Sequence, residues 1–429
     1  MYEHFGNPSS IHAYAKPCKQ AIDLARMRVM KSLNAKKKEE ILFTSCGTES
    51  DNCAIALACD GFRLMNKDLV PHVITTIVEH PAVLVYLETE KKKGSLTYSL
   101  VPVDTEGVAK IGEFEEQLKK FGNKVACVTI MHANNETGAV QPVREIADIT
   151  KKYNKKIFVH TDAAQSFGKV RVDADELNVD AITIVGHKIG APKGIAALYL
   201  RETFMNEMYT KDASGAAEDL IYRSFLKGGG QEFGKRAGTE NVLHIVGLGK
   251  ACEIADEEFE AFVVHTKSMR DLLFEKLRSL HGMKNRFVAN GPKDDSKRLP
   301  NTLSVAIRDV SAGSLLLELK DELAASAGAA CHSSDATGSI SSVLLAMNLD
   351  ENLARGTLRL SVGRHTTEKE ILRAVRSIES VVIKQSIRKE FNIPCEFAEP
   401  VPPRASKTAP TTVITTIKTN ESSDAVVSR

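Results

Sequence analysis

The stretch that decides the fold runs from residue 179 to residue 188: Val179-Asp180-Ala181-Ile182-Thr183-Ile184-Val185-Gly186-His187-Lys188. Its apolar part predicts a buried strand, and Lys188 follows where that strand ends. Asp162 follows a second apolar run, Lys156-Ile157-Phe158-Val159-His160-Thr161. In an α/β sheet, the carboxyl ends of successive parallel strands open into the same crevice. We therefore expect Asp162 and Lys188 to face one binding site.

An aspartate and a lysine placed in this way suit pyridoxal 5'-phosphate (PLP). A lysine amine forms a Schiff base with the aldehyde of PLP, and a carboxylate keeps the pyridine nitrogen protonated so that the ring acts as an electron sink. Taken alone, the pair fits equally well an aspartate at a strand end and a lysine on the surface that bind no cofactor, because strand ends often carry such residues. The neighbouring stretches decide between these two interpretations.

A phosphate site is predicted near the amino end of the chain. The run Ile41-Leu42-Phe43-Thr44 is typical of a short buried strand, and the small-residue turn Ser45-Cys46-Gly47-Thr48 leads into a helical pattern. A helix start presents free backbone N–H groups and a positive dipole end to an anion, and Thr48 adds a hydroxyl. An ordinary helix cap explains the turn taken alone. Together with the aspartate and the lysine, a phosphate site at Gly47 and Thr48 is the better interpretation.

The rest of the chain predicts a two-domain α/β protein. Apolar strands alternate with helical patterns up to about residue 250, which indicates a mainly parallel doubly wound sheet. A long helical pattern follows, with Met269, Leu273 and Leu277 on one face, and it leads into a smaller α/β portion. We predict a PLP-binding large domain over residues 1–250, a small C-terminal domain over residues 251–394, and a disordered tail over residues 395–429.

Composition narrows the class of protein. The 429 residues are 43% hydrophobic and 26% charged, which is ample for a core, and the net charge of +2 argues against a nucleic-acid or membrane surface. Eight scattered cysteines, without metal-ligand spacing, are typical of reduced thiols in the cytoplasm. Four of them read as core residues: Cys53, Cys59, Cys127 and Cys252. The charge run Lys36-Lys37-Lys38-Glu39-Glu40 reads as solvated surface, and no apolar stretch is long enough to span a bilayer.

Ten stretches, taken together, resemble the NifS-like class V family of PLP enzymes, which contains cysteine desulfurases and selenocysteine lyases. They include Asn134-Asn135-Glu136-Thr137-Gly138 and Ala329-Ala330-Cys331-His332-Ser333, and they occur in family order over most of the chain. The others are residues 5–10, 44–52, 79–80, 160–165, 186–188, 236–241, 298–302 and 359–364. Residues 183–188, 228–232 and 328–333 are most similar to selenocysteine lyase. The resemblance implies the PLP-dependent transferase fold type I.

The resemblance also implies a set of cofactor contacts. His80 would stack on the pyridine ring and move protons, although a strand-end histidine without that duty is the alternative. Gln165 would hydrogen-bond the ring hydroxyl, and His187 would hold the phosphate. Thr239 would reach the phosphate in the partner subunit, so the active unit would be a homodimer. The implied cofactor-binding residues are Gly47, Thr48, His80, Asp162, Gln165, His187, Lys188 and Thr239.

Three further residues would bind the substrate or react with it. Asn135 and Arg359 would bind the carboxylate of an amino acid, because a guanidinium makes two parallel hydrogen bonds that lysine cannot reproduce. Cys331 lies in a stretch of small and polar residues that is typical of a mobile loop. Its thiolate would attack the sulfur or selenium of the substrate and carry that atom as a persulfide or selenopersulfide. The implied catalytic residues are Lys188, Cys331 and His80.

The expected activity is therefore PLP-dependent removal of sulfur or selenium from L-cysteine or L-selenocysteine, which leaves L-alanine and passes the atom to an acceptor protein. Two alternatives stay open: another class V aminotransferase or lyase, which would not need Cys331, and a catalytically impaired cofactor-binding scaffold. The scaffold is favoured by the start at Met1-Tyr2-Glu3-His4-Phe5, because the usual N-terminal segment of the family is absent. The same feature hides any organelle presequence. Val185 also replaces a serine of many desulfurases, which removes one expected phosphate contact.

Overall fold

The computed structural model describes residues 4–204, 226–283, 285–327 and 340–391. The chain divides into two compact units, Met1–Ile387 and Arg388–Arg429. The predicted tail, residues 395–429, lies outside the described residues. Within the described ranges, no helix is long and apolar enough to cross a membrane.

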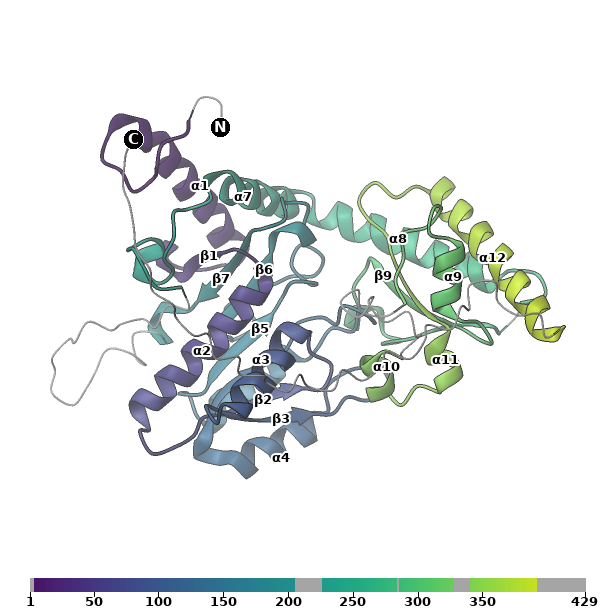
Figure 1. Cartoon of the computed structure of the whole chain (residues 1–429), viewed down its shortest axis with the longest axis horizontal. Helices are drawn as coiled ribbons and strands as arrows, with labels where there is room; N and C mark the ends of the chain where they lie inside the picture. Colours follow the sequence, from purple (N-terminus) through teal and green to yellow (C-terminus); the bar gives the residue numbers. More distant parts are fainter. Residues whose placement is uncertain (1–3, 205–225, 284, 328–339, 392–429) are drawn as a thin grey trace, which may run out of the picture. The chain divides into compact units, whose positions relative to one another are not determined.

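A seven-stranded sheet forms the larger part of the first unit (Figure 1). The strands lie in the order β1-β7-β6-β5-β4-β2-β3. Neighbours from β6 to β3 are parallel, while β7 is antiparallel to both β6 and β1. The prediction of a mainly parallel sheet is thus confirmed. The strand bounds are Ile41–Thr44 (β1), His72–Thr76 (β2), Thr97–Val101 (β3), Val125–Thr129 (β4), Phe158–Asp162 (β5), Ala181–Val185 (β6) and Ala196–Leu200 (β7).

Helices cover both faces of this sheet, which explains why its inner strands are continuous apolar runs. One buried core joins the sheet to α2 and α3, and the other joins it to α1, α4, α5 and α7. The four cysteines predicted to be core residues are all buried. The helix bounds are Lys16–Ser32 (α1), Gly47–Met65 (α2), Pro81–Lys92 (α3), Ile111–Phe121 (α4), Val143–Tyr153 (α5) and Val242–Glu257 (α7).

A second, three-stranded antiparallel sheet has a core of its own, in the order β10-β9-β8. Helix α8, Phe259–Arg278, leads from α7 to this small sheet (Figure 1) and buries the predicted apolar face. The remaining bounds are Phe287–Ala289 (β8), Thr302–Ile307 (β9), Thr357–Ser361 (β10), Ala312–Glu318 (α9), Ser342–Ala346 (α10), Glu351–Arg355 (α11) and Glu368–Glu390 (α12). The division into domains at residue 250 stays a prediction.

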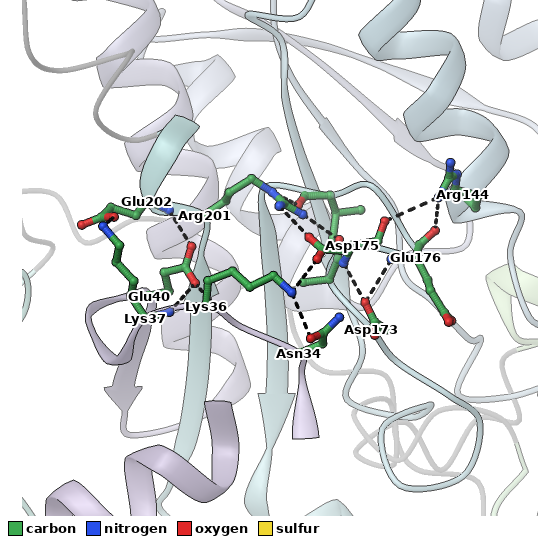
Figure 2. Close-up of polar contacts among 12 residues, drawn as sticks. Asn34, Lys36, Lys37, Glu40, Arg144, Asp173, Asp175, Glu176, Arg201 and Glu202 are labelled. Carbon is green, nitrogen blue, oxygen red and sulfur yellow. Dashed lines mark hydrogen bonds and ion pairs between the residues drawn. The ribbon is translucent and has the colours of Figure 1, made fainter. Parts of the chain in front are cut away.

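The charge run before β1 corrects one expectation (Figure 2). Lys36 and Lys37 reach solvent and pair with Asp175 and Glu202, as a surface run should. Glu40 is only 4% exposed. Its carboxylate accepts hydrogen bonds from the backbone N–H groups of Lys36, at 2.7 Å, and of Glu202, at 3.0 Å. The prediction of a solvated surface is wrong for Glu40 because this carboxylate satisfies backbone donors of two segments.

Candidate active site

The ends of β5 and β6 bring Asp162 and Lys188 together. The two strands are parallel neighbours, with Asp162 in register with Thr183. Beyond β6 the chain makes a short 3-10 turn, Gly186–Lys188, which carries the lysine. Burial raises the pKa of Asp162 to about 6, and the positive charge of Lys188 acts in the opposite direction. One carboxylate oxygen, Oδ1, accepts a hydrogen bond from the N–H of Ala164 at 2.8 Å.

The predicted phosphate turn lies against the end of β6. Helix α2 begins at Gly47 after an extended Cys46, whose side chain does not cap the first N–H groups of the helix. A Cβ atom on Gly47 would lie 2.7 Å from Cγ2 of Val185, so only glycine fits unless the Val185 side chain shifts. Thr48 lies in the first turn of the helix and is exposed. The turn, the aspartate and the lysine therefore share one end of the sheet.

An ion pair holds the segment of Thr239, another predicted phosphate contact, next to this turn. The carboxylate of Glu49 pairs with Arg236, with 2.9 Å between Oε1 and Nε. Glu49 also accepts a hydrogen bond from the N–H of Ser45 at 2.7 Å. Because Arg236 precedes Thr239 by three residues, the pair holds the segment of Thr239 beside α2. Thr239 itself is exposed.

His80 stands at the start of α3, which begins at Pro81. Its Nδ1 accepts a hydrogen bond from the N–H of Ala82 at 3.1 Å, so the neutral ring carries its proton on Nε2. The preceding residue, Glu79, is 5% exposed and accepts hydrogen bonds from Thr76 Oγ1 at 2.6 Å and from the N–H of Met131 at 2.9 Å. Burial raises the pKa of Glu79 to about 8. This carboxyl group connects the end of β2 to the chain that follows β4.

The two predicted substrate residues, one from the small sheet and one from a turn after β4, contact each other. Arg359 lies on β10, and its Nη1 donates a hydrogen bond to the backbone carbonyl of Asn135 at 2.8 Å. Asn135 belongs to a turn that Asn134 braces, because Asn134 Oδ1 accepts from the N–H groups of Glu136 and Thr137, both at 2.9 Å. This contact brings the guanidinium of Arg359, a group that can bind a carboxylate, to the backbone of Asn135.

Sequence reasoning missed a second amine at this site. Lys169 is 8% exposed, and its Nζ donates to the backbone carbonyl of Gln165 at 2.8 Å. Burial lowers the pKa of Lys169 to about 7, and the charges of Lys188 and Arg359 act in the same direction. The sequence shows only that Lys169 lies four residues after Gln165, which does not predict that its amine is buried at this site.

A buried carboxyl group next to the phosphate turn was missed as well. Asp51, in the second turn of α2, is 2% exposed, and its Oδ1 has no hydrogen-bond partner among the described residues. His160 Nε2 lies 3.8 Å away, and it contacts Thr183 Oγ1 at 3.0 Å. Burial raises the pKa of Asp51 well above its usual range, and the negative charge of Asp162 adds to this effect. Asp51 is therefore harder to ionise than an ordinary aspartate.

The predicted nucleophile, Cys331, lies outside the described residues. The described cysteines all have free thiols, and Cys46 is the exposed one among them. His187, a predicted phosphate contact, is exposed on the turn that carries Lys188. Partial burial lowers the pKa of His187, and the charge of Lys188 acts in the same direction. The roles of the predicted site residues stay predictions.

The arrangement fits PLP. The carboxylate of Asp162 is buried, with one oxygen held by a backbone N–H, and it suits a protonated pyridine nitrogen. Lys188, which lies beside it, suits the aldehyde. The start of α2, which Cys46 leaves uncapped, supplies N–H donors for a phosphate. Asp162, Lys188 and Thr48 are the residues that would hold the group.

Comparisons with known proteins agree on one family. A family model described as aminotransferase class-V matches residues 1–373. Cysteine desulfurase IscS of Clostridium botulinum is 38% identical over 371 residues, which cover 86% of this chain and 85% of that protein. Selenocysteine lyase of Homo sapiens is 38% identical over 404 residues, which cover 89% of this chain and 86% of that protein.

Solved structures give the same result. A NifS-like protein superposes with a TM-score of 0.74 at 33% identity, covering 88% of this chain and 92% of the other. SspA in complex with cysteine superposes with a TM-score of 0.63 at 28% identity, covering 85% and 92%. The similarity therefore includes both sheets.

Proposed function

Because the chain belongs to the class V aminotransferase family, we propose that it removes sulfur or selenium from L-cysteine or L-selenocysteine with PLP, leaving L-alanine. Similar relatives bear both names, cysteine desulfurase and selenocysteine lyase, at the same 38% identity. The observation that carries the proposal is the meeting of Asp162 and Lys188 at the ends of β5 and β6.

The large sheet would supply the cofactor contacts. When bound, PLP supplies an electron sink that makes the Cα proton of an amino acid acidic. Asp162 would keep a proton on the pyridine nitrogen, and Lys188 would bond to the aldehyde and then move protons at the substrate. The first N–H groups of α2, with Thr48, would bind the phosphate. His80 and Gln165 would orient the ring.

The substrate would lie between the two sheets. Arg359 and Asn135 would bind its carboxylate. The thiolate of Cys331 would attack the sulfur or selenium atom, so that a bond to Cys331 forms while the bond to Cβ breaks. The electron pair of the broken bond stays with the carbon, which becomes the methyl group of alanine after protonation. An acceptor protein would then take the atom from Cys331.

Alanine release tests the proposal directly. Purified PLP-loaded protein should release alanine from cysteine, from selenocysteine or from both, and the ratio of the two kcat/KM values would assign the preferred element. An aminotransferase would instead convert a 2-oxo acid without consuming sulfur. Loaded protein that releases no alanine from either amino acid would contradict the proposal and favour the scaffold.

We also propose a homodimer in the cytoplasm. Large apolar side chains are exposed near the amino end of the chain, among them Ile11, Tyr14 and Met27, and a second copy would cover them. The exposed Thr239 would then reach the site of the partner. Free thiols in the described residues support a reducing compartment. Light scattering of the loaded protein tests the dimer, and a monomeric mass would contradict it.

A further inference from the structure

The turn that follows β5 buries the side chain of Lys169, which is 8% exposed. Within the turn, the N–H of Lys169 donates to the carbonyl of Ser166 at 2.9 Å. Gly168 has a φ of 73°, a conformation that glycine adopts without strain. A Cβ atom at Gly168 would lie 3.1 Å from Cγ2 of Ile189, the residue after Lys188. The turn of Lys169 therefore packs against the turn that carries Lys188.

The same turn is bonded to the chain that leads to the predicted substrate residues. Ser166 Oγ forms a hydrogen bond with Nδ1 of His132 at 2.9 Å. His132 precedes Asn135 by three residues. The backbone carbonyl of Asn135 in turn accepts the hydrogen bond from Arg359. The turn of Lys169 is therefore linked to the substrate side of the site as well as to the cofactor side.

Positive charges gather around the amine of Lys169. Burial lowers the pKa of Lys169 to about 7, and the charges of Lys188 and Arg359 act in the same direction. Its Nζ donates to the backbone carbonyl of Gln165 at 2.8 Å, which offers only a partial negative charge. Positive groups close together repel one another, and an anion that binds among them relieves this repulsion. Because Arg359 is the predicted ligand of a carboxylate, the carboxylate of an amino acid is the anion that suits this cluster.

We infer that Lys169 is a positioning residue for the substrate carboxylate, an inference that rests on the proposed function. Its charge would hold the carboxylate at Arg359 without touching it, because Coulomb attraction acts over several ångströms in a partly buried site. The hydrogen bond to the carbonyl of Gln165 would keep the amine in place. A bound carboxylate would in turn favour the charged form of Lys169.

Two ligands that differ in one group test this role. L-Alanine carries a carboxylate and ethylamine lacks it, and both amines should change the absorption spectrum of the full, PLP-loaded chain. Lys169→Met keeps the length of the side chain and removes its charge. We expect this variant to raise the Kd of L-alanine about tenfold at neutral pH, because a nearby unit charge has effects of at least this size. The Kd of ethylamine and the retention of PLP should stay within about twofold.

Two further variants serve as controls. Lys169→Arg keeps the charge, so its Kd for L-alanine should lie within about threefold of the wild-type value. Lys156→Met removes an exposed charge before the start of β5 and should leave both binding constants unchanged. If Lys169→Met does not fold, Lys169→Gln gives the same comparison of the two ligands.

Three results would overturn the inference. An equal rise in both binding constants would show that Lys169 acts only by holding Gln165 and the cofactor. An unchanged Kd for L-alanine would show that the charge plays no part. A wild type that binds L-alanine no more tightly than ethylamine would show that the carboxylate is not recognised. These constants need no sulfur chemistry, so they decide the inference even if the loaded protein releases no alanine from cysteine or selenocysteine.

Discussion

Lys188 shares its site with a second amine, Lys169, and only one of them is suited to bond with a cofactor. Lys169 is 8% exposed, and its Nζ is engaged by the carbonyl of Gln165. Lys188 is exposed and lies within the electrostatic reach of Asp162. The low pKa of Lys169, about 7, would make it nucleophilic, but burial restricts access to it. Accessibility therefore supports the prediction that Lys188, rather than Lys169, bonds to the cofactor.

Reductive trapping tests this selection. Borohydride reduction of the loaded protein, followed by peptide mapping, should place the pyridoxyl label on Lys188 and none on Lys169. Lys188→Ala should abolish turnover, because Lys169, the second amine whose pKa is affected by the charge of Lys188, is buried. A label on Lys169 in the wild type would refute the assignment, and Lys169→Ala serves as the control that retains the label.

The buried Glu79 gives a prediction for stability against pH. Its pKa is raised from 4.5 in the unfolded chain to about 8 in the folded protein. Between these values the folded state keeps a proton that the unfolded state has lost, so stability from this group falls as pH rises. The slope is about 1.4 kcal/mol per pH unit, and the total over the window is on the order of a few kcal/mol.

Glu79→Gln cannot titrate, so it isolates this contribution. The unfolding free energy of the variant minus that of the wild type should rise between pH 5 and pH 8, because only the wild type has a proton to lose at position 79. An unpaired amide would add a constant penalty without changing the slope. Denaturant unfolding of both proteins, freed of cofactor and at one concentration, measures the difference. A difference that does not vary with pH would refute the raised pKa.

At the scale of elements, the start of α2 depends on its contact with β6. Gly47 has no room for a side chain because Val185 lies against it, and Val185 is itself only 6% exposed. The helix therefore begins as close to the strand as a backbone allows. This contact places the first N–H groups of α2 near the turn that carries Lys188.

Gly47→Ala should separate the two elements. We expect a loss of about 1–3 kcal/mol in stability from overpacking and a weakening of PLP affinity by about tenfold, because the N–H donors move away from the phosphate. The double variant Gly47→Ala with Val185→Ala should recover much of both, since the smaller residue makes room. Affinity and melting temperature measure the outcome, with Val185→Ala alone as control. Unchanged PLP affinity in Gly47→Ala would show that the phosphate is bound elsewhere.

At the scale of the whole molecule, the site combines contributions of two sheets. The predicted cofactor residues come from the large sheet, the predicted substrate residue Arg359 comes from the small one, and Cys331 follows α9 and precedes α10 in the sequence. Cofactor binding and sulfur removal should therefore be separable by single substitutions.

Cys331→Ser provides that separation. The variant should fold, hold PLP and respond spectrally to cysteine, because none of these steps uses the thiol. Alanine release from cysteine should be lost, while selenocysteine should retain some activity because a selenolate is the better leaving group. Cys46→Ser, which changes an exposed cysteine outside this segment, should keep full activity. Undiminished cysteine turnover in Cys331→Ser would end the nucleophile assignment.

The sequence alone predicts the parts of this site that depend on local pattern. Asp162 and Lys188 follow apolar runs, so their positions at strand ends could be inferred directly. Glu136 and Asp51 could not, because their surroundings are built from distant parts of the chain: Ser341 is 205 residues from Glu136. A buried polar group reveals itself only when the segments that satisfy it are brought together. The part played by Cys331 stays a prediction.

The position of β1 at the edge of the large sheet also affects how the protein is made. Among the described strands, residues 41–44 pair with β7 alone, whose partners run from Ala196 to Tyr199. On the ribosome, β1 and the turn that follows it therefore emerge long before the strand that supports them. Pairing across such a separation is slow and leaves an apolar edge exposed in the meantime. The predicted phosphate turn therefore lacks the support of a neighbouring strand until β7, which ends at Leu200, has been translated.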